Sequence, residues 1–582
     1  MELTLIAVVG VISLVAVAAF SERLGLAAPL SLVIVGIGLS FVPGVPHPDV
    51  EPEWILAGVL PPLLYSAAVT MPVVDFRRNI RPITSLAVVL VVVTTLGTGW
   101  LFHWLLPSIG WPAAFALGAV ISPTDAVAAT AVGRKLGLPH RLLTLLEGEG
   151  LVNDASALVL LRSAVAAFAG TVSVWSVAGK FVYAVVVAIA VGLVVGLLNV
   201  RVRALFKDPV LNTAISFVVP FIAYLPAEEF DASGVLAVVV AGIVTGHESP
   251  RRLRAQDRLA EATNWRTLSF LLENGMFLLM GLSVKTLVDE VGDTGPSFAR
   301  TLGIGLLAAA TAVVLRMVYV VPLIASSRRE QRRAADAKPR VEQMRDDLQS
   351  GELTARSPQG PRSEKWMERV ERRITRVSAN LDFSLNETLG WRGGVVLAWS
   401  GMRGAITLAA AQTLPQDTPL RPQLILIAFV VAATTLLLQG LSLPWVIRRV
   451  KIPADDPERL RDDFTHLLTE LRETVVAVLD DPGTTTADGT PYDPRVVAHI
   501  RANNRLLAHD KSRPSRERTP DTDVRDHQYL QLSLRLLDAE TAHVLKARAS
   551  GAYSSRALNR IQNAIDVEAA QLQQIQATSR DL

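Results

Sequence analysis

Apolar runs about as long as a bilayer is thick recur along the first 450 residues of this chain. A helix needs about 20 predominantly apolar residues to cross the hydrocarbon core, and 50% of the 582 residues are hydrophobic. The predicted fold class is therefore an all-α polytopic membrane protein. About thirteen transmembrane helices are expected on this criterion, at residues 3–20, 26–42, 54–71, 83–106, 111–133, 142–169, 175–200, 209–226, 232–246, 266–284, 299–325, 391–414 and 420–447.

Lys and Arg residues alternate between the loops on the two sides of these spans. Basic clusters follow the first, third, fifth, seventh and ninth spans, whereas the loop after the eighth is acidic, with Glu228, Glu229 and Asp231. Because cytoplasmic loops carry the excess of basic residues, the N-terminus is expected outside and the C-terminus in the cytoplasm. The expected location is the plasma (inner) membrane, in contact with lipid. The net charge of +3 is then a topology signal, and no nucleic-acid partner is expected.

Three absences in the sequence narrow the function. The chain has no cysteine, which excludes disulfides and Cys-based zinc sites. It has no P-loop motif, which argues against an ATP-driven pump, and no cofactor is expected. The first residues lack the positive region of a cleaved signal peptide, so the first apolar run is expected to remain as a span.

Two domains are predicted. Residues 1–450 form the transmembrane domain, with a hydrophilic cytosolic insertion at 326–390, and residues 451–582 form a cytosolic, largely helical tail. Apolar residues of the insertion recur at helical spacing, which fits either a helix on the inner membrane surface or a solvated amphipathic helix; they are Trp366, Val370, Ile374 and Val377. The tail carries no catalytic signature, so packing, self-association and regulation all remain open for it.

The sixth span contains three acids and an asparagine. At about 1.5 Å per residue, Asp154 lies about 18 Å from Leu142, near the middle of the bilayer. Charges at that depth are costly and usually mark an ion path or a proton relay. On a helix Glu147 shares the face of Asp154, whereas Glu149 points about 140° away. Asp154 and Glu149 therefore need different partners, and Glu147 stays without an assigned role.

The fifth span is interrupted at its centre by Ser122, Pro123, Thr124 and Asp125. Proline removes one helical hydrogen bond and obstructs the carbonyl four residues earlier, so polar groups become available beside Asp125. A structural kink alone would need the proline but not an acid two residues later. The pattern favours a binding role for Thr124 and Asp125.

The twelfth span carries Arg403 between Gly401 and Gly404. A guanidinium stays protonated, so a buried arginine needs an acid. Glu149, directed away from Asp154, is the partner that we expect, as a structural ion pair. The fifth and twelfth spans are antiparallel and seven spans apart, which predicts inverted repeats with an ion site between two broken crossing helices.

These residues resemble the monovalent cation/proton antiporters of the NhaP/NHE branch, the Na⁺/H⁺ exchanger family. The resemblance covers residues 3–449 apart from the insertion and depends on four blocks in the family's order: Leu60 to Tyr65, Ser122 to Asp125, Glu149 to Asp154 and Gly401 to Ile406. It implies a homodimer of thirteen-helix protomers, each with a dimerisation part and a mobile six-helix core. Asp154 would bind a cation or a proton in turn, supported by Asn153 and Thr124, with Asp125 at the crossing of the broken helices and Glu149 paired with Arg403.

Two positions refine what the resemblance implies. Several relatives have an acid after the Leu-Pro-Pro block, where this chain has Ser66; Ser66 is kept as an expected ion-site residue beside Asp154 and Thr124. Asn153 stands where a second aspartate would be, which in this family goes with electroneutral exchange of one cation for one proton. The expected function is antiport of Na⁺, with K⁺ and Li⁺ as alternatives, for H⁺ in pH and sodium homeostasis.

Two other functions fit parts of the pattern. An intramembrane aspartyl protease would use Asp125 and Asp154 as a carboxyl dyad, but neither is flanked by the glycines expected of that class, and a dyad does not need Arg403. A membrane-anchored sensor would need far fewer spans. The protein is therefore expected to be a transporter and not an enzyme.

Overall fold

The computed structural model describes residues 2–24, 27–43, 45, 51–168, 174–292, 298–350, 364–387, 389–486, 488–504, 506 and 522–580. The protein is all-α, as predicted. Across these residues the one β interaction is an isolated bridge between Thr485 and Pro491 in the tail. Parts of the expected loops, at residues 46–50, 169–173 and 293–297, lie outside the described residues.

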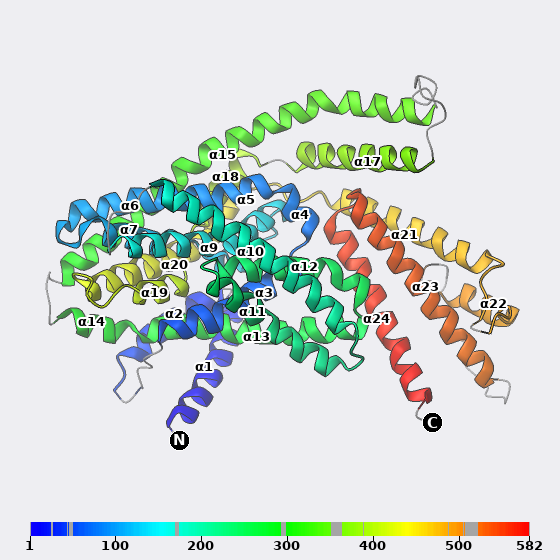
Figure 1. The fold of residues 1–582 in the computed structure, drawn as a ribbon, viewed down its shortest axis with the longest axis horizontal. Helices are drawn as coiled ribbons and strands as arrows, with labels where there is room; N and C mark the ends of the chain where they lie inside the picture. The colour runs from blue at the N-terminus through cyan, green and yellow to red at the C-terminus, as the bar shows by residue number, and fades with distance from the viewer. Residues whose placement is uncertain are drawn as a thin grey trace.

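The bundle that precedes the tail is built from long helices that run side by side (Figure 1). In chain order its elements are α1 (Glu2–Leu24), α2 (Ala28–Ser40), η1 (Trp54–Val59), α3 (Leu60–Thr70), α4 (Val73–Arg78), α5 (Ile80–Thr84), η2 (Ser85–Leu90), α6 (Val91–Leu105), η3 (Pro107–Ile109), α7 (Gly110–Ile121), α8 (Ala126–Lys135), α9 (His140–Ala166), α10 (Val174–Arg203), α11 (Pro209–Glu229), α12 (Gly234–Arg252), α13 (Ala255–Leu282), α14 (Val284–Gly292), α15 (Phe298–Gln349), α18 (Trp391–Trp399), α19 (Ala405–Gln412) and α20 (Arg421–Val450).

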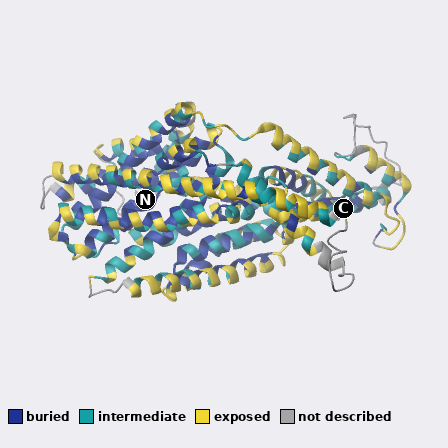
Figure 2. Cartoon of the chain, turned by 90° about the horizontal axis from the view of Figure 1, so that it is seen from above, coloured by how far each residue is buried: buried dark blue, intermediate teal, exposed yellow. Residues whose placement is uncertain are grey.

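Seven of the described helical segments are long and apolar enough to cross a membrane, and three shorter apolar helices accompany them. The expected count of thirteen spans stays a prediction. α9 is not among the seven because it carries several charged residues. The expected twelfth span is not among them because it is divided into two short helices, α18 and α19. The outward faces of the bundle are exposed while its interior is buried (Figure 2), and the exposed face of α10 is rich in valine and leucine, as a lipid-facing helix requires.

The helices pack in two groups. The core group consists of α6, α7, α8, α9, α15, α18, α19 and α20, and α9 packs against α6, α7 and α8 within it. The scaffold group consists of α2, α3, α10, α11, α12 and α13, in which α12 lies between α3, α10 and α11. Asp154 is therefore on the core group, and the wall that it faces belongs to the scaffold group.

The insertion begins as a continuation of the eleventh span, because α15 runs without interruption to Gln349, well beyond the expected end at 325. Its second half forms α17 (Glu364–Asn386), which packs against α15 as a hairpin that leaves the bundle (Figure 1). Ile374 is buried and Lys338 of α15 bonds Asp382 at 2.7 Å. Packing against α15 therefore buries part of the apolar face of α17 without a membrane surface. The Trp366 side chain lies outside the described residues.

The tail forms α21 (Pro457–Asp480), α22 (Pro494–Asn503), α23 (Thr522–Ser550) and α24 (Ser555–Arg580). Buried leucines, valines and isoleucines of α21, α23 and α24 make a core of their own. The tail also contacts the bundle, since α24 packs along α13, where Arg258 Nε bonds Asp566 Oδ2 at 3.0 Å. The last tail helix is thus held at one end of the bundle, which we call the tail side.

A cluster of charges joins the tail to the start of α9. His140, two residues before the expected 142–169 span, lies with its Nε2 2.9 Å from Asp75 Oδ2. Its backbone N–H donates to Asp455, which also accepts from Arg556 at 2.6 Å, and Glu387 and Arg141 complete the cluster. Burial alone would lower the pKa of His140, but the hydrogen bond and charge of Asp75 outweigh it and the pKa is raised above its usual value.

Candidate functional site

The two interrupted helices cross at their breaks, as the sequence predicted. The first break separates α7 from α8 over residues 122–125, and the second separates α18 from α19 over residues 400–404. The Asp125 backbone N–H donates to the Met402 carbonyl oxygen at 2.7 Å, so the two breaks are joined directly. A Cβ on Gly404 would overlap the Asp125 carboxylate, which explains why glycine is needed at this crossing.

Arg403 lies at the crossing with 1% of its surface exposed, but its partners are carbonyl groups. Its Nε donates to the Ile121 carbonyl at 3.1 Å and its Nη1 to the Gly401 carbonyl at 2.6 Å. Ile121 is the last residue of α7, and the final carbonyls of a helix lack internal donors and carry partial negative charge. Arg403 therefore supplies a hydrogen-bond donor to the C-terminal end of α7.

The expected ion pair between Glu149 and Arg403 is wrong, because Glu149 is paired with Arg316 of α15. Arg316 Nη2 donates to Glu149 Oε2 at 2.8 Å, its Nη1 bonds Glu149 Oε1, and its Nε donates to the Leu397 carbonyl at 3.1 Å. Glu149 and Arg316 are 2% and 1% exposed. A bidentate guanidinium pair satisfies a buried carboxylate better than a guanidinium already committed to two carbonyls.

The sequence analysis missed Arg316 although a signal was present. Arg316 is the single charged residue between Arg300 and Arg328, in the middle of an otherwise apolar run. An intramembrane charge of this kind calls for a partner by the same reasoning that was applied to Arg403. The helical spacing of the acids on α9 predicted correctly that Glu149 turns away from Asp154. Two arginines could pair with Glu149, and only the packing of α15 against α18 decides between them.

Thr124 and Asn153 connect the first break to α9. The Thr124 hydroxyl donates to Glu149 Oε1 at 2.7 Å, and Asn153 Nδ2 donates to the Thr124 carbonyl at 2.7 Å. Pro123 prevents the regular helical bonding of this segment, so Asn153 takes up a carbonyl that the break exposes. The arrangement fixes the break against the helix that carries Asp154.

Asp154 is 8% exposed and forms no hydrogen bond or ion pair with any residue that the structure describes. Asp125, in contrast, caps α8 by accepting the Val127 N–H at 2.8 Å. Glu149 is neutralised by Arg316 and is therefore not free to exchange its charge. Of the three acids expected at this depth, Asp154 alone keeps a carboxyl group without a protein partner in the described chain.

A cavity of about 960 Å³ opens on the tail side and reaches this crossing. Asp154, Asp125 and Thr124 line it from the core group, and Ser66 lines it from α3. Its rim includes Glu147, which pairs with Arg134 at 2.5 Å, and residues of α24 in the tail. The structure therefore brings together Asp154, Thr124, Asp125 and Ser66 around one cavity and gives Glu147 an ion pair at the rim.

A second cavity of about 370 Å³ lies on the opposite side of the crossing. It is lined by Glu51, by the far end of α13 and by α19, and Met276 and Ala405 belong to the walls of both cavities. The two cavities therefore approach one another at these two residues. Cavities on both sides of a pair of broken helices are the geometry that alternating access requires.

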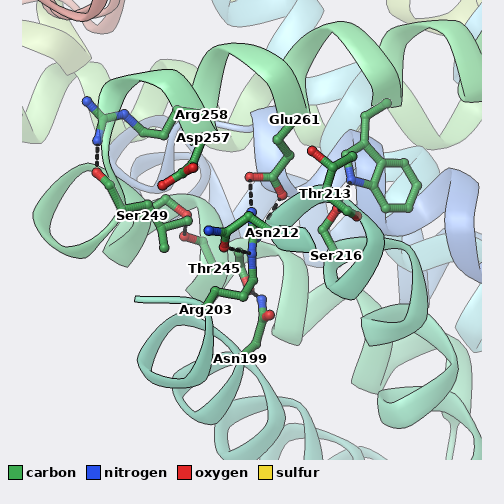
Figure 3. A network of polar contacts seen from close by, with 12 residues as sticks. Asn199, Arg203, Asn212, Thr213, Ser216, Thr245, Ser249, Asp257, Arg258 and Glu261 are labelled. Atoms are coloured by element: carbon green, nitrogen blue, oxygen red, sulfur yellow. Dashed lines mark hydrogen bonds and ion pairs between the residues drawn. The ribbon is translucent and has the colours of Figure 1, made fainter. Parts of the chain in front are cut away.

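A buried polar network holds the scaffold wall of the tail-side cavity together (Figure 3). Arg203 of α10 binds Glu261 of α13 through two hydrogen bonds of 3.0 and 2.8 Å and also bonds Asn212 of α11. Asn199 bridges Tyr65 of α3 and Thr245 of α12. These hydrogen bonds join side chains of five helices, α3, α10, α11, α12 and α13.

Comparison with known proteins gives one family from a family model and from curated relatives, and a solved structure shares the fold. A family model described as the transmembrane sodium/hydrogen exchanger matches residues 10–449. An uncharacterized Na⁺/H⁺ exchanger of Mycobacterium tuberculosis is 27% identical over 98% of this chain and 96% of its own length. The low-affinity Na⁺/H⁺ antiporter NhaS1 of Synechocystis is 30% identical over 74% of this chain and 71% of its own. The sodium proton antiporter MjNhaP1 of Methanocaldococcus jannaschii shares the fold with a TM-score of 0.54 at 16% identity, over 77% of this chain and 99% of that one.

Proposed function

The chain belongs to the family of transmembrane sodium/hydrogen exchangers, and we propose that it exchanges Na⁺ for H⁺ at Asp154. The observation that carries the proposal is the state of Asp154 itself. It is an intramembrane carboxyl group at the end of a cavity, and no described residue pairs with it. Such a group is costly unless a proton or a cation occupies it.

Competition for this one carboxyl group couples the two ions. Burial favours the protonated acid, whereas a bound cation favours the carboxylate, so a proton and a cation exclude one another. If the core group reorients only when Asp154 is neutral, neither ion crosses alone. The gradient of one ion then drives the other, and no further energy source is needed.

Neutral oxygens complete the proposed ion site. Thr124 and Ser66 lie on the cavity wall and offer hydroxyl oxygens, the ligand type that hard cations prefer. We propose Na⁺ as the cation that these oxygens bind, with K⁺ and Li⁺ as alternatives. Because one carboxyl group exchanges one charge, we propose electroneutral exchange of one cation for one proton, in the service of pH and sodium homeostasis.

The neighbours of Asp154 have supporting roles in this proposal. Asn153 holds the break at Thr124 beside the exchanging acid, and Asp125 caps α8 and joins the two breaks. Glu149 and Arg316 form a permanent neutral pair that anchors α9 to α15. Met276 and Ala405 form the barrier that opens toward one side or the other.

We extend the proposal to the arrangement in the membrane. The alternation of basic loops supports an N-terminus outside and a tail in the cytoplasm of a plasma (inner) membrane, so the tail-side cavity is the cytoplasmic one. The resemblance supports a homodimer. The domain division into a transmembrane part at 1–450 and a cytosolic tail at 451–582 is supported by the separate apolar core of the tail helices.

Everted vesicles from a host without its own antiporters test the proposal. Addition of Na⁺, K⁺ or Li⁺ to vesicles with an established proton gradient is expected to dequench a pH-sensitive dye with the wild-type chain. Asp154→Asn is expected to abolish the response at every pH while the protein still inserts and purifies. The matched control is Glu229→Gln, an exposed acid at the end of α11. Retained pH-dependent exchange in Asp154→Asn would sink the assignment.

A further inference from the structure

Glu273 of α13 is a fourth carboxyl group in this region of the bundle, and the sequence analysis did not single it out. It lies in the middle of the apolar segment 255–291 and lines the tail-side cavity together with Asp125 and Asp154. Within the described chain it has no hydrogen bond and no ion pair. A lone acid within a membrane span is costly, so its position calls for a ligand that comes and goes.

The position of Glu273 along α13 puts it at the inner end of the cavity. A stripe of α13 residues lines the cavity at helical spacing, namely Arg258, Glu261, Trp265, Ser269, Glu273 and Met276. At about 1.5 Å per residue, Glu273 lies about 22 Å beyond Arg258 at the rim and about 4.5 Å before Met276. Met276 belongs to both cavities, so Glu273 stands just before the barrier.

Glu273 and Asp154 approach the same space from opposite walls. Glu273 belongs to the scaffold group, Asp154 and Asp125 belong to the core group, and all three line the tail-side cavity. Several acids at the inner end of a cavity favour cations there. Carboxylate oxygens are also strong ligands for hard cations, so a cation that enters the cavity meets Glu273 on its way to Asp154.

A hydrogen bond between two serines joins α3 to α13 near Glu273. Ser66 carries no charge, and its hydroxyl accepts a 2.8 Å hydrogen bond from Ser269, one turn before Glu273. At this part of the scaffold wall the charged group is therefore Glu273, whereas Ser66 contributes a neutral hydroxyl.

We infer that Glu273 is the cation-docking residue of the scaffold wall, which captures a hard monovalent cation at the end of the cavity and passes it to Asp154. The inference rests on the proposed function and adds a second residue to the ion path. Glu273 remains with the scaffold group when the core group moves, so it does not carry charge across and the exchange of one cation for one proton is unchanged. Its contribution is therefore to cation capture and not to the reorientation step.

Cation titrations of exchange in everted vesicles separate these contributions. Glu273→Gln is expected to raise the KM for Na⁺ and Li⁺ about tenfold, equivalent to about 1.4 kcal/mol of binding free energy, with kcat within about twofold of wild type. Glu273→Asp, which keeps the charge on a shorter stem, is expected to give an intermediate KM. Ser66→Glu in the Glu273→Gln background returns a carboxylate to the scaffold wall and is expected to lower the KM again.

The controls distinguish failure of the inference from failure of the proposed function. Absence of exchange in the wild-type chain, or its persistence in Asp154→Asn, contradicts the function itself. An unchanged KM in Glu273→Gln beside a wild-type response in Glu229→Gln overturns the role of Glu273. If Glu273→Gln does not fold, Glu273→Asp decides: a KM raised severalfold supports the inference, and a wild-type KM overturns it.

Discussion

Replacing Arg316 by methionine removes the positive member of the buried pair with Glu149 and leaves the volume of α15 nearly unchanged. Both side chains are almost fully buried, and removal of one partner from a buried pair typically costs about 3–5 kcal/mol because the other charge remains without compensation. The Leu397 carbonyl also loses its donor, which adds about 1 kcal/mol. We expect Arg316→Met to lower the free energy of unfolding by about 5 kcal/mol.

A double-mutant cycle identifies the partner. In Arg316→Met/Glu149→Leu both charges are gone, and replacing a buried pair by apolar groups is often close to neutral. The double variant should therefore be more stable than the sum of the single losses predicts, with a coupling free energy of about 3 kcal/mol, at the upper end for residues in contact. Glu149 with Arg403, whose guanidinium binds carbonyl groups, should couple by less than about 1 kcal/mol.

Denaturant titrations of the purified variants in mixed micelles, followed by circular dichroism, give these free energies. A loss below about 1 kcal/mol for Arg316→Met, or a stronger coupling of Glu149 to Arg403 than to Arg316, would refute the reasoning.

Three further predictions concern the crossing, the junction and the tail. Gly404→Ala places a Cβ against the Asp125 carboxylate and is expected to cost about 1–3 kcal/mol and most of the exchange activity, whereas Gly10→Ala, with open space around it, serves as the tolerated control. Because the pKa of His140 is raised on folding, its stabilising contribution is complete below about pH 6.5 and is lost as the pH rises through the raised pKa. Thermal stability of His140→Gln should therefore fall less steeply with pH over that range, and a fall as steep as in the wild type contradicts the assignment. Asp566→Asn removes the ion pair that holds α24 on α13 and should weaken docking of the tail by about 2 kcal/mol. Limited proteolysis should then cleave the tail of the variant faster than that of the wild type, and equal cleavage rates would mean that other contacts hold α24.

Local sequence rules were sufficient for the breaks in two helices and for the faces of α9 on which its acids lie, whereas the depth of the acids in the membrane stays a prediction. Proline at 123 and glycines at 401 and 404 act within a few residues of their own positions, so the interruptions of the fifth and twelfth spans could be predicted without tertiary information. The same holds for the opposite phases of Asp154 and Glu149 on α9, which follow from 3.6 residues per turn. Both features are confirmed by the helices that the structure describes.

The partner of Glu149 could not be predicted from these local rules. Two intramembrane arginines were available to Glu149, and the sequence places Arg316 167 residues and Arg403 254 residues away from it, separations that carry no information about distance in space. Packing of α15 against α18 brings Arg316 to the carboxylate, while the end of α7 takes Arg403.

The sequence by itself determined that this chain crosses the membrane many times, breaks two of its helices and turns Asp154 and Glu149 to different faces of one helix, because hydrophobic length, helix-breaking residues and helical phase are local properties. The tertiary structure alone decided which acids are neutralised and which share a cavity. Neutralisation of Glu149 by Arg316, and the placement of Glu273 and Asp154 on the walls of one cavity, depend on how helices far apart in the chain pack together. Charge pairing is decided by distance in space, and that distance is set by packing and not by sequence separation.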